Sequence, residues 1–344
     1  MKATRPATPK GKPLPAQPSR YNPDTDGVTF SLLTQFKDCR ELSRLSLNGW
    51  TALQPSMPLI FGGVTHGLFE RVYADMQKTK QTKPPTDKFV HDRLAAIEQL
   101  WKIENPRASA QSLQYLEMTQ TVAQAIMPIY FRHWQTDFAD LRWLPQGLER
   151  EFKIPMTGMA AQGVPWRTFI RGKMDGIFFR GKQNAVWLFE TKTKSRIEDS
   201  AIADIMPFEL QVGIYLWAVW RLTGVVPAGV LYNILRRPGL RQKQGESLAT
   251  FGARMIQDIH DRPDWYFIRM EMEITKTDLE RTEAELRDLV GDFILWWKGQ
   301  TGHYRNSSHC ENKYGTCHML PICSRRDTTG FYQRDRIFLE LENM

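Results

Sequence analysis

Three residues in the middle of the chain combine types and a spacing that suit phosphodiester hydrolysis. Asp175 stands in GKMDGIFF, and Glu190 and Lys192 stand in VWLFETKTKS. Carboxylate oxygens are the ligands that Mg²⁺ and Mn²⁺ prefer, and such an ion polarises a phosphoryl oxygen and lowers the pKa of a bound water. A neighbouring lysine can orient that water or stabilise charge that develops on phosphorus. We therefore treat these three residues as the candidate catalytic centre.

Two apolar runs around a turn must position these residues. The first run ends the segment 166–180, the second covers 185–191, and a Gly-Lys turn signal separates them. If both runs are strands of one hairpin, Asp175 and Glu190 lie near the same end of the ladder. Residues 190 and 192 then project from one face. The alternative is an exposed hairpin with ordinary charged ends, because a Glu-x-Lys triplet alone is a weak signal.

The periodicity of apolar residues predicts a mixed α/β fold without internal repeats. Helical spacing dominates residues 31–134, and short apolar runs between turn signals follow it. The predicted helices are 31–47, 63–76, 89–103, 108–134, 206–222 and 275–297. The predicted strands are 149–155, the two runs of the hairpin, 229–235 and 265–272. This order indicates one sheet with a helical elaboration before it.

The excess positive charge is concentrated at the N-terminus. The net charge is +8, and the first 20 residues contain five basic residues, no acid and five prolines. Such a segment cannot bury enough apolar surface to offset its ordering entropy, so we expect a disordered basic tail over residues 1–25. The tail could hold phosphates non-specifically, or it could be a solvated leader.

The sequence contains no segment with the composition of a membrane span or a secretory signal. No run approaches the roughly 18 apolar residues of a span, and the N-terminus lacks an apolar signal region. We therefore expect no membrane partner and a location in the cytoplasm of a bacterium or of a phage-infected host.

The four cysteines are distributed unevenly. Cys39 stands alone, whereas Cys310, Cys317 and Cys323 crowd into the last tenth of the chain. Without a secretory signal a disulfide framework is not expected. Clustered cysteines in a reducing compartment suggest a metal or iron–sulfur site.

Two polar residues of the helix predicted over 206–222 extend the pattern. Gln211 and Tyr215 are four residues apart and share a helix face, although both could equally be capping or core polar groups. Asp175, then Glu190-Thr-Lys192, then Gln211 and Tyr215 resembles the RecB-like branch of the PD-(D/E)XK nuclease superfamily, over roughly residues 31–326. The resemblance implies a restriction-endonuclease-like core, which is a mixed central sheet flanked by helices. It also implies that Gln211 and Tyr215 contact the substrate or brace the catalytic residues.

The same resemblance implies a metal ligand upstream of the strands. The branch carries a histidine on a helix, and the candidate here is His66 in GGVTHGLFER. Without the resemblance, a helix histidine satisfied by a neighbour is the simpler interpretation. With it, His66, Asp175 and Glu190 would hold one or two Mg²⁺ or Mn²⁺ ions, and Lys192 would assist the attacking water. Glu149 or Glu151 matches an acidic position often seen in this branch.

The cysteine pattern resembles that of the AddB and CRISPR-associated RecB-like iron–sulfur nucleases. In those proteins the two chain ends are clasped around a 4Fe–4S cluster with four cysteine ligands. The resemblance therefore implies Cys39, Cys310, Cys317 and Cys323 as cluster ligands. Zinc is an alternative, held by four thiolates or by three with His309 or His318. Unliganded, partly buried cysteines are a third interpretation.

The implied function is that of a metal-dependent DNA nuclease, an exonuclease acting at DNA ends or on single strands. A helicase or recombination protein would act in trans, because the chain lacks the G-x-x-x-x-G-K-[ST] phosphate loop. Bases could stack on Trp166, Tyr232 or Trp265. One alternative is a catalytically inactive DNA-binding or assembly module that keeps the fold. Another is a structural protein whose cysteines bind zinc.

The resemblance also implies a domain layout. After the tail of residues 1–25, a single nuclease domain is expected over residues 26–330, with a C-terminal extension over 327–344. Within the domain we expect a helical insertion at about 77–145 and a catalytic core at about 146–273. A C-terminal helix and the cysteine clasp would follow over 274–326.

Overall fold

A computed structural model describes the chain from residue 21 to residue 338, apart from residues 107, 182, 196–203, 313–314 and 335–336. The chain divides into two compact units built from separated segments. The first, here called the sheet unit, consists of Gln54–Arg150 and Lys173–Glu280. The second, here called the cysteine unit, consists of Met1–Leu53, Glu151–Gly172 and Arg281–Met344. The domain boundaries expected from the sequence stay a prediction.

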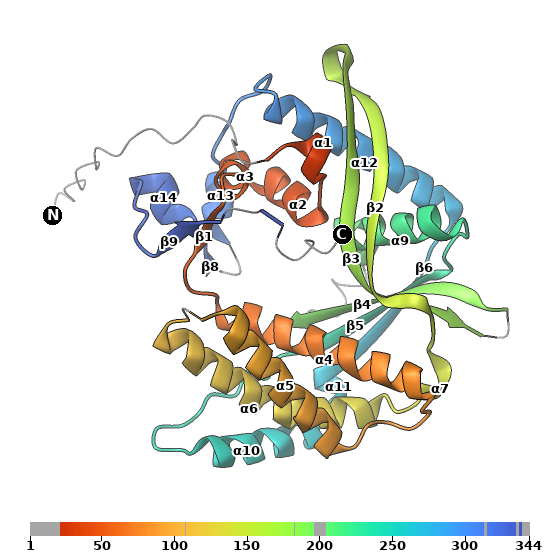
Figure 1. The fold of residues 1–344 in the computed structure, drawn as a ribbon, viewed down its shortest axis with the longest axis vertical. Helices are drawn as coiled ribbons and strands as arrows, with labels where there is room; N and C mark the ends of the chain where they lie inside the picture. The colour runs from red at the N-terminus through yellow and green to blue at the C-terminus, as the bar shows by residue number, and fades with distance from the viewer. Residues whose placement is uncertain are drawn as a thin grey trace. The chain divides into compact units, whose positions relative to one another are not determined.

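A five-stranded mixed sheet with the order β2-β3-β4-β5-β6 underlies the candidate site (Figure 1). Its strands are β2 (Arg142–Ala160), β3 (Val164–Arg180), β4 (Ala185–Lys194), β5 (Gly229–Arg236) and β6 (Phe267–Glu273). β3 pairs with β4 in antiparallel orientation, which confirms the predicted hairpin. β4 and β5 are parallel, so a crossover must join them, and α9 (Leu210–Thr223) supplies it. β5 and β6 are antiparallel.

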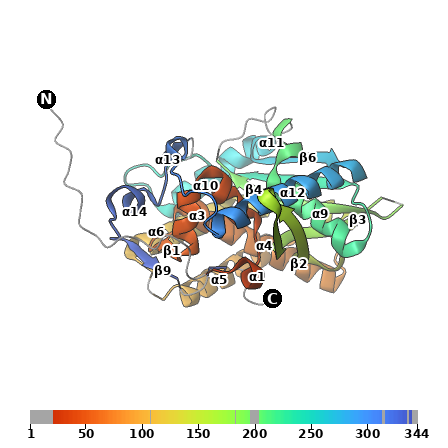
Figure 2. The ribbon, with the colours of Figure 1, turned by 90° about the horizontal axis from the view of Figure 1, so that it is seen from above.

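Helices cover the sheet unit's strands, as the mixed α/β prediction requires (Figures 1 and 2). One core joins inward-facing residues of β3, β4 and β5 to the buried sides of four helices. These helices are α4 (Met57–Thr79), α5 (Asp87–Glu104), α6 (Ala110–His133) and α10 (Leu248–Asp261). α9 packs against β4 and β5. Shorter elements of this unit are α7 (Asp137–Asp140), η2 (Met206–Phe208) and α11 (Pro263–Tyr266).

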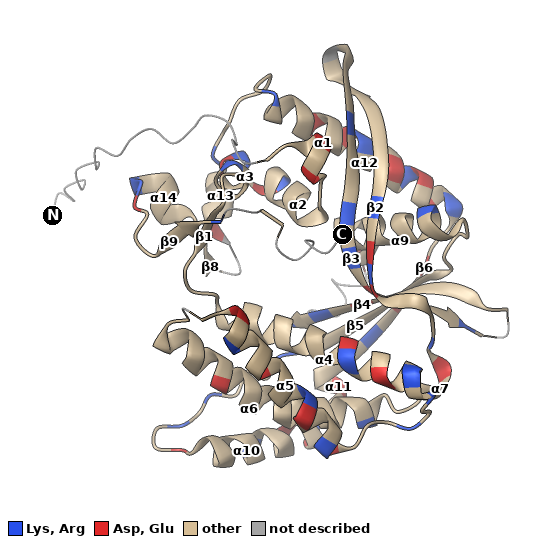
Figure 3. Ribbon diagram, viewed as in Figure 1, with Lys and Arg blue, Asp and Glu red and all other residues tan. Residues whose placement is uncertain are grey.

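The cysteine unit is assembled from the two ends of the chain and the middle segment Glu151–Gly172. Its helices are α1 (Pro23–Asp26), α2 (Phe30–Asp38), α3 (Arg40–Leu47), α13 (Ser307–Cys310), α14 (Leu320–Arg325) and most of α12 (Lys276–Trp297). β1 (Trp50–Ala52) pairs with β9 (Phe331–Gln333), and β7 (Glu311–Asn312) pairs with β8 (Gly315–Thr316). Acidic and basic residues both occur along α12 (Figure 3). No helix within the described ranges is long and apolar enough to cross a membrane.

Several predicted elements differ from the observed ones. The helix expected over 31–47 is two helices, because Cys39 between them is extended with φ −163° and ψ 115°. The helix expected over 206–222 is likewise interrupted at Glu209, which caps α9. α10 was not predicted, although Phe251, Met255 and Ile259 recur every four residues and are buried.

Residues 21–25, which the expected tail of residues 1–25 includes, lie in the described part of the chain. Pro23 begins α1, which Asn22 caps through its side chain, and the Tyr21 hydroxyl donates to the carbonyl of Gly27 at 2.7 Å. A capped helical turn with a buried tyrosine anchors this segment. Residues 1–20 lie outside the described residues.

Candidate metal and catalytic site

The hairpin brings the three residues of the candidate catalytic centre together. Asp175 lies inside β3 rather than at the start of a strand, because β3 extends back to Val164. The main-chain N–H of Thr191 on β4 donates to Asp175 Oδ2 at 2.7 Å. Lys192 Nζ donates to Glu190 Oε1 at 2.7 Å. The geometry therefore places two carboxylates and an ammonium at one point, as the spacing predicted.

α4 and β2 add two further ligand groups to this point. His66 Nδ1 lies 3.2 Å from Asp175 Oδ1. His66, Glu149 and Asp175 each offer one ligand atom, and these atoms all lie within 4.8 Å of one another. Of the two acids that the sequence left open, Glu149 is therefore the one in the cluster. Its φ of 46° lies in the left-handed region, which non-glycine residues seldom adopt and which is frequent at functional sites.

Gln211 and Tyr215 of α9 reach the same cluster. Lys192 Nζ donates to Gln211 Oε1 as well as to Glu190, and Gln211 is hydrogen-bonded to Tyr215. Burial raises the pKa of Tyr215, and the carboxylate of Glu190 raises it further, so the phenol stays neutral. The shared helix face predicted from their spacing is thus directed at the candidate catalytic lysine.

The carboxylates crowd one another strongly. Burial raises the pKa of Glu190 to about 7, with Lys192 opposing and Asp175 adding to the shift. Burial and the charge of Asp175 raise the pKa of Glu149 to about 7 as well, although Lys173 Nζ lies 2.5 Å from its Oε2. Burial alone would raise the pKa of Asp175 too, but His66 and the Thr191 N–H hold it below its usual value.

The two basic groups respond to these carboxylates. Burial alone would lower the pKa of His66, but Asp175 above all, with Glu190 and Glu149, raises it. Burial would also lower the pKa of Lys192, yet Glu190 and Asp175 raise it, so its side chain is an ammonium at neutral pH. The site therefore attracts positive charge beyond that of its own residues.

The space and the donors fit one hard divalent cation. A cavity of about 10 Å³ is lined by His66, Glu149 and Asp175, together with Thr191 and aromatic side chains of α4 and β4. That volume is about one water-sized sphere. Glu190 is 1% exposed, and its Oε2 has no hydrogen-bond partner among the described residues. A buried carboxylate oxygen without a partner is costly unless a cation meets it.

Comparisons with known proteins give a structural likeness only. No protein-family model matches the chain, and no curated protein matches it. A solved structure of a protein called "Putative exonuclease" from Eubacterium rectale is similar with a TM-score of 0.42 and 12% sequence identity. The match covers 85% of this chain and 92% of that one.

The four cysteines gather in the cysteine unit. Cys39 belongs to a small buried cluster with Leu42, Leu45, Met319 and Ile322, against which Cys317 and Cys323 pack. Burial raises the pKa of Cys317, and so do the neighbouring thiols of Cys310 and Cys39. Burial likewise raises the pKa of Cys323, with Cys39 and Cys310 adding to the shift. The structure thus brings the distant Cys39 to the C-terminal trio, while their ligand role stays a prediction.

Two of the three aromatic residues suggested for base stacking are buried. Tyr232 is fully buried, and its hydroxyl donates to Glu209 Oε2 at 2.9 Å. Trp166 is buried because its ring packs over Gly158 of β2, where a Cβ would lie 2.3 Å from it. Only Trp265 of the three is open, at 49% exposure, with the Arg236 guanidinium 3.7 Å from its ring centre.

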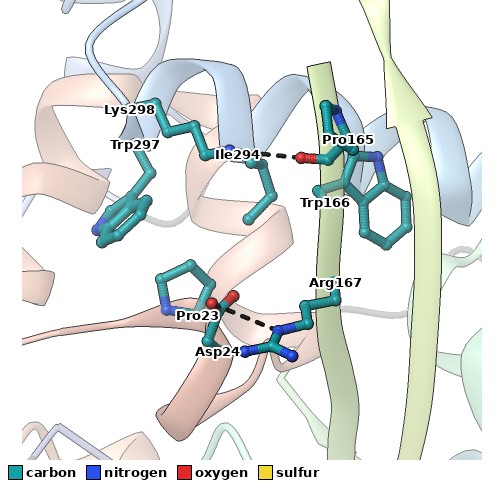
Figure 4. A pocket seen from close by; sticks show the side chains of 8 residues that line it. All are labelled: Pro23, Asp24, Pro165, Trp166, Arg167, Ile294, Trp297 and Lys298. Carbon is teal, nitrogen blue, oxygen red and sulfur yellow. Dashed lines mark hydrogen bonds and ion pairs between the residues drawn. The ribbon is translucent and has the colours of Figure 1, made fainter. Parts of the chain in front are cut away.

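A larger pocket in the cysteine unit is separate from the carboxylates. It has a volume of about 360 Å³ and lies between α1, β3 and α12 (Figure 4). Lys298 Nζ donates to the Pro165 carbonyl at 3.4 Å, and Arg167 lies 3.8 Å from Asp24, so its charged rim is internally paired. The pocket shares no residue with the candidate site and offers no comparable chemistry.

Sequence reasoning missed two participants. Lys173 is two residues before Asp175 on β3, and this strand spacing was the signal that could have placed it on the same face. The contribution of Thr191 comes from its main-chain N–H, which no residue type reveals.

Proposed function

We propose that this chain is a metal-dependent DNA nuclease, an exonuclease that hydrolyses phosphodiester bonds at DNA ends or in single strands. The observation that carries the proposal is the convergence of His66, Glu149 and Asp175 on one small cavity. Lys192 donates to Glu190 Oε1, and Glu190 Oε2 has no hydrogen-bond partner among the described residues. Carboxylates with one imidazole suit Mg²⁺ or Mn²⁺. The order Asp175, Glu190-Thr-Lys192, Gln211, Tyr215 supports DNA as the substrate by resemblance.

When bound, the cation would polarise the phosphoryl oxygen and lower the pKa of a water. His66, Asp175 and Glu190 would hold it, with Glu149 as a further ligand. The ammonium of Lys192 donates to Glu190 and Gln211, which hold it in place. Lys192 would orient the attacking water or stabilise the charge that develops on the phosphate. Because its pKa is raised, Lys192 acts as a positive donor and not as a base at neutral pH.

We further propose that the four cysteines hold a 4Fe–4S cluster. The packing of Cys317 and Cys323 against the small cluster that contains Cys39 supports a shared ligand set. The resemblance to the iron–sulfur nucleases supports a four-iron cluster over zinc. A helicase or recombination protein in trans and a cytoplasmic location complete the proposal.

Digestion of end-labelled DNA tests the proposed activity. Linear single-stranded and duplex substrates and the corresponding circles are incubated with the purified protein and Mn²⁺. We expect release of labelled nucleotides from linear DNA, no cleavage of circles, and full inhibition by EDTA. DNA binding without cleavage would favour the inactive module, and cleavage that persists in EDTA would refute the metal-dependent mechanism.

A further inference from the structure

A buried chain of hydrogen bonds leads away from Thr191, the residue between the acid and the lysine of β4. Asn233 of β5 donates from Nδ2 to Thr191 Oγ1 at 3.2 Å. The Oδ1 atom of Asn233 accepts from the Tyr130 hydroxyl of α6 at 2.9 Å. The same oxygen accepts from Arg269 Nε of β6 at 3.1 Å. Both hydrogen-bonding ends of the Asn233 amide are therefore used inside the core.

Arg269 connects this chain to two more elements. Its guanidinium forms two bonds of 2.6 Å with the carboxylate of Asp137 on α7 and donates to the Tyr130 hydroxyl at 3.0 Å. Asp137 also accepts from the Tyr73 hydroxyl of α4 at 2.7 Å. We call the six residues the Asn233–Arg269 network; they are Tyr73, Tyr130, Asp137, Thr191, Asn233 and Arg269.

The side chains of the network are polar and almost completely buried. Asn233 and Tyr130 are fully buried, and Arg269 and Asp137 are nearly so. A buried ion pair stabilises a protein little more than apolar residues of the same volume, since desolvation offsets the attraction. A fully hydrogen-bonded buried network does, however, fix the relative geometry of the elements that contribute to it.

Two ends of the network reach the candidate metal site. Thr191 donates its main-chain N–H to Asp175 Oδ2 at 2.7 Å, while its side chain is held by Asn233. The ring of Tyr73 lines the cavity together with His66 and Asp175. One carboxylate oxygen of Asp175 is thereby occupied by the main chain, and the other faces His66 Nδ1.

We infer that the Asn233–Arg269 network is a positioning device for Asp175. It anchors the side chain of Thr191, so that the N–H of Thr191 orients the carboxylate and directs Oδ1 toward the cation position. The inference rests on the proposed function, because the metal site is what the network serves. Thr191 and Asn233 are accordingly positioning residues, since they act through Asp175.

Two substitutions test the network, and the first of them changes the side-chain volume little. Thr191→Val removes the hydroxyl but keeps the N–H, and Asn233→Ala removes the anchor. Thr193→Val, two residues on and on the same face of β4, is the matched control. Thr191→Ser restores the hydroxyl. The readouts are Mn²⁺ affinity by calorimetry and hydrogen exchange of the residue 191 amide in metal-free protein.

We expect Thr191→Val and Asn233→Ala to weaken Mn²⁺ binding about 10-fold or more, as loss of a residue that orients a ligand typically does. Both should also accelerate exchange at residue 191, whereas Thr191→Ser and Thr193→Val should match wild type. Unchanged affinity and exchange in Thr191→Val and Asn233→Ala would overturn the inference. Mn²⁺ binding without DNA cleavage would defeat the proposed function alone, and a wild type that binds no Mn²⁺ would defeat both.

Discussion

Glu149 is an acid that the fold holds where its charge is unfavourable. Its pKa is about 7 in the folded protein, above the ordinary value of 4.5. Between these values the folded state binds more protons than the unfolded state, so this group lowers stability as pH rises from about 4.5 to 7. Above pH 7 the stability lost through Glu149 stays constant. A bound divalent cation would restore it by neutralising the carboxylate charge.

Glu149→Gln should therefore become more stable relative to wild type as pH rises. In EDTA, we expect the difference in unfolding free energy to move in favour of the variant between pH 4.5 and 8. The change in this difference is at most roughly 3 kcal/mol, because the pKa of Glu149 rises from 4.5 to about 7 and each pKa unit corresponds to about 1.4 kcal/mol. Denaturant unfolding at both pH values measures it, with Glu151→Gln as the control. A difference in unfolding free energy that does not change with pH would contradict the claim that the ionised Glu149 destabilises the folded protein.

Residue types and spacing went far toward identifying this centre. Asp175, Glu190 and Lys192 were found from their strand context, and Gln211 and Tyr215 from helical spacing. The choice between Glu149 and Glu151 could not be made, because the left-handed φ of Glu149 shifts the strand's alternation. The buried Asn233 is also unremarkable in sequence, since its partners lie on three other elements.

At the scale of elements, β5 must fit closely between its two neighbours. A Cβ at Gly229, where β5 begins, would lie 2.1 Å from the Met272 carbonyl oxygen of β6 and 2.9 Å from the Trp187 ring of β4. The backbone oxygen cannot move without disturbing the ladder. We expect Gly229→Ala to lower the free energy of unfolding by about 1–3 kcal/mol, as overpacking does.

Gly239→Ala is the matched control for this prediction, because a Cβ at Gly239 meets nothing within 4 Å. Thermal unfolding followed by circular dichroism compares the two variants. Equal melting temperatures would mean that β5 and β6 are not packed as described.

Elements were predictable where one period of hydrophobicity ran uninterrupted. The β3–β4 hairpin and α4 follow from such runs, and the parallel β4–β5 pair follows once α9 is placed between them. Interruptions within a predicted helix were not predictable. The apolar residues before and after Cys39 keep one helical spacing; they are Leu32, Leu33, Phe36, Leu42 and Leu45. The pattern of apolar residues therefore does not reveal that Cys39 is extended. That residue departs from the helix where it joins the other cysteines.

At the scale of the whole molecule, the cysteine unit joins residues more than 260 positions apart. Asn306 donates its main-chain N–H to Cys39 Sγ at 3.5 Å, next to the C-terminal trio. If these thiols hold a 4Fe–4S cluster, anaerobically purified protein should be brown, absorb near 400 nm and contain iron and labile sulfide. Cys317→Ala should lose the colour and lower the melting temperature, because metal binding is coupled to folding.

A colourless protein that contains zinc would contradict the iron–sulfur proposal while leaving the carboxylate site untouched. The two centres are therefore testable separately. The gathering of the four cysteines could be expected from sequence only through the resemblance, because neither charge nor periodicity relates Cys39 to residues 310–323.

The central claim is that His66, Asp175, Glu190 and Lys192 form a metal-dependent phosphodiesterase centre. The most direct measurement is the single-turnover rate of Mn²⁺-dependent cleavage of end-labelled single-stranded DNA by wild type and by Lys192→Ala. Lys102→Ala, which removes an exposed ion pair with Glu98 on α5, is the control. We predict a loss of at least about 100-fold in Lys192→Ala, as for removal of a charge-stabilising donor, and wild-type cleavage by the control. Equal rates in Lys192→Ala and wild type would contradict the account.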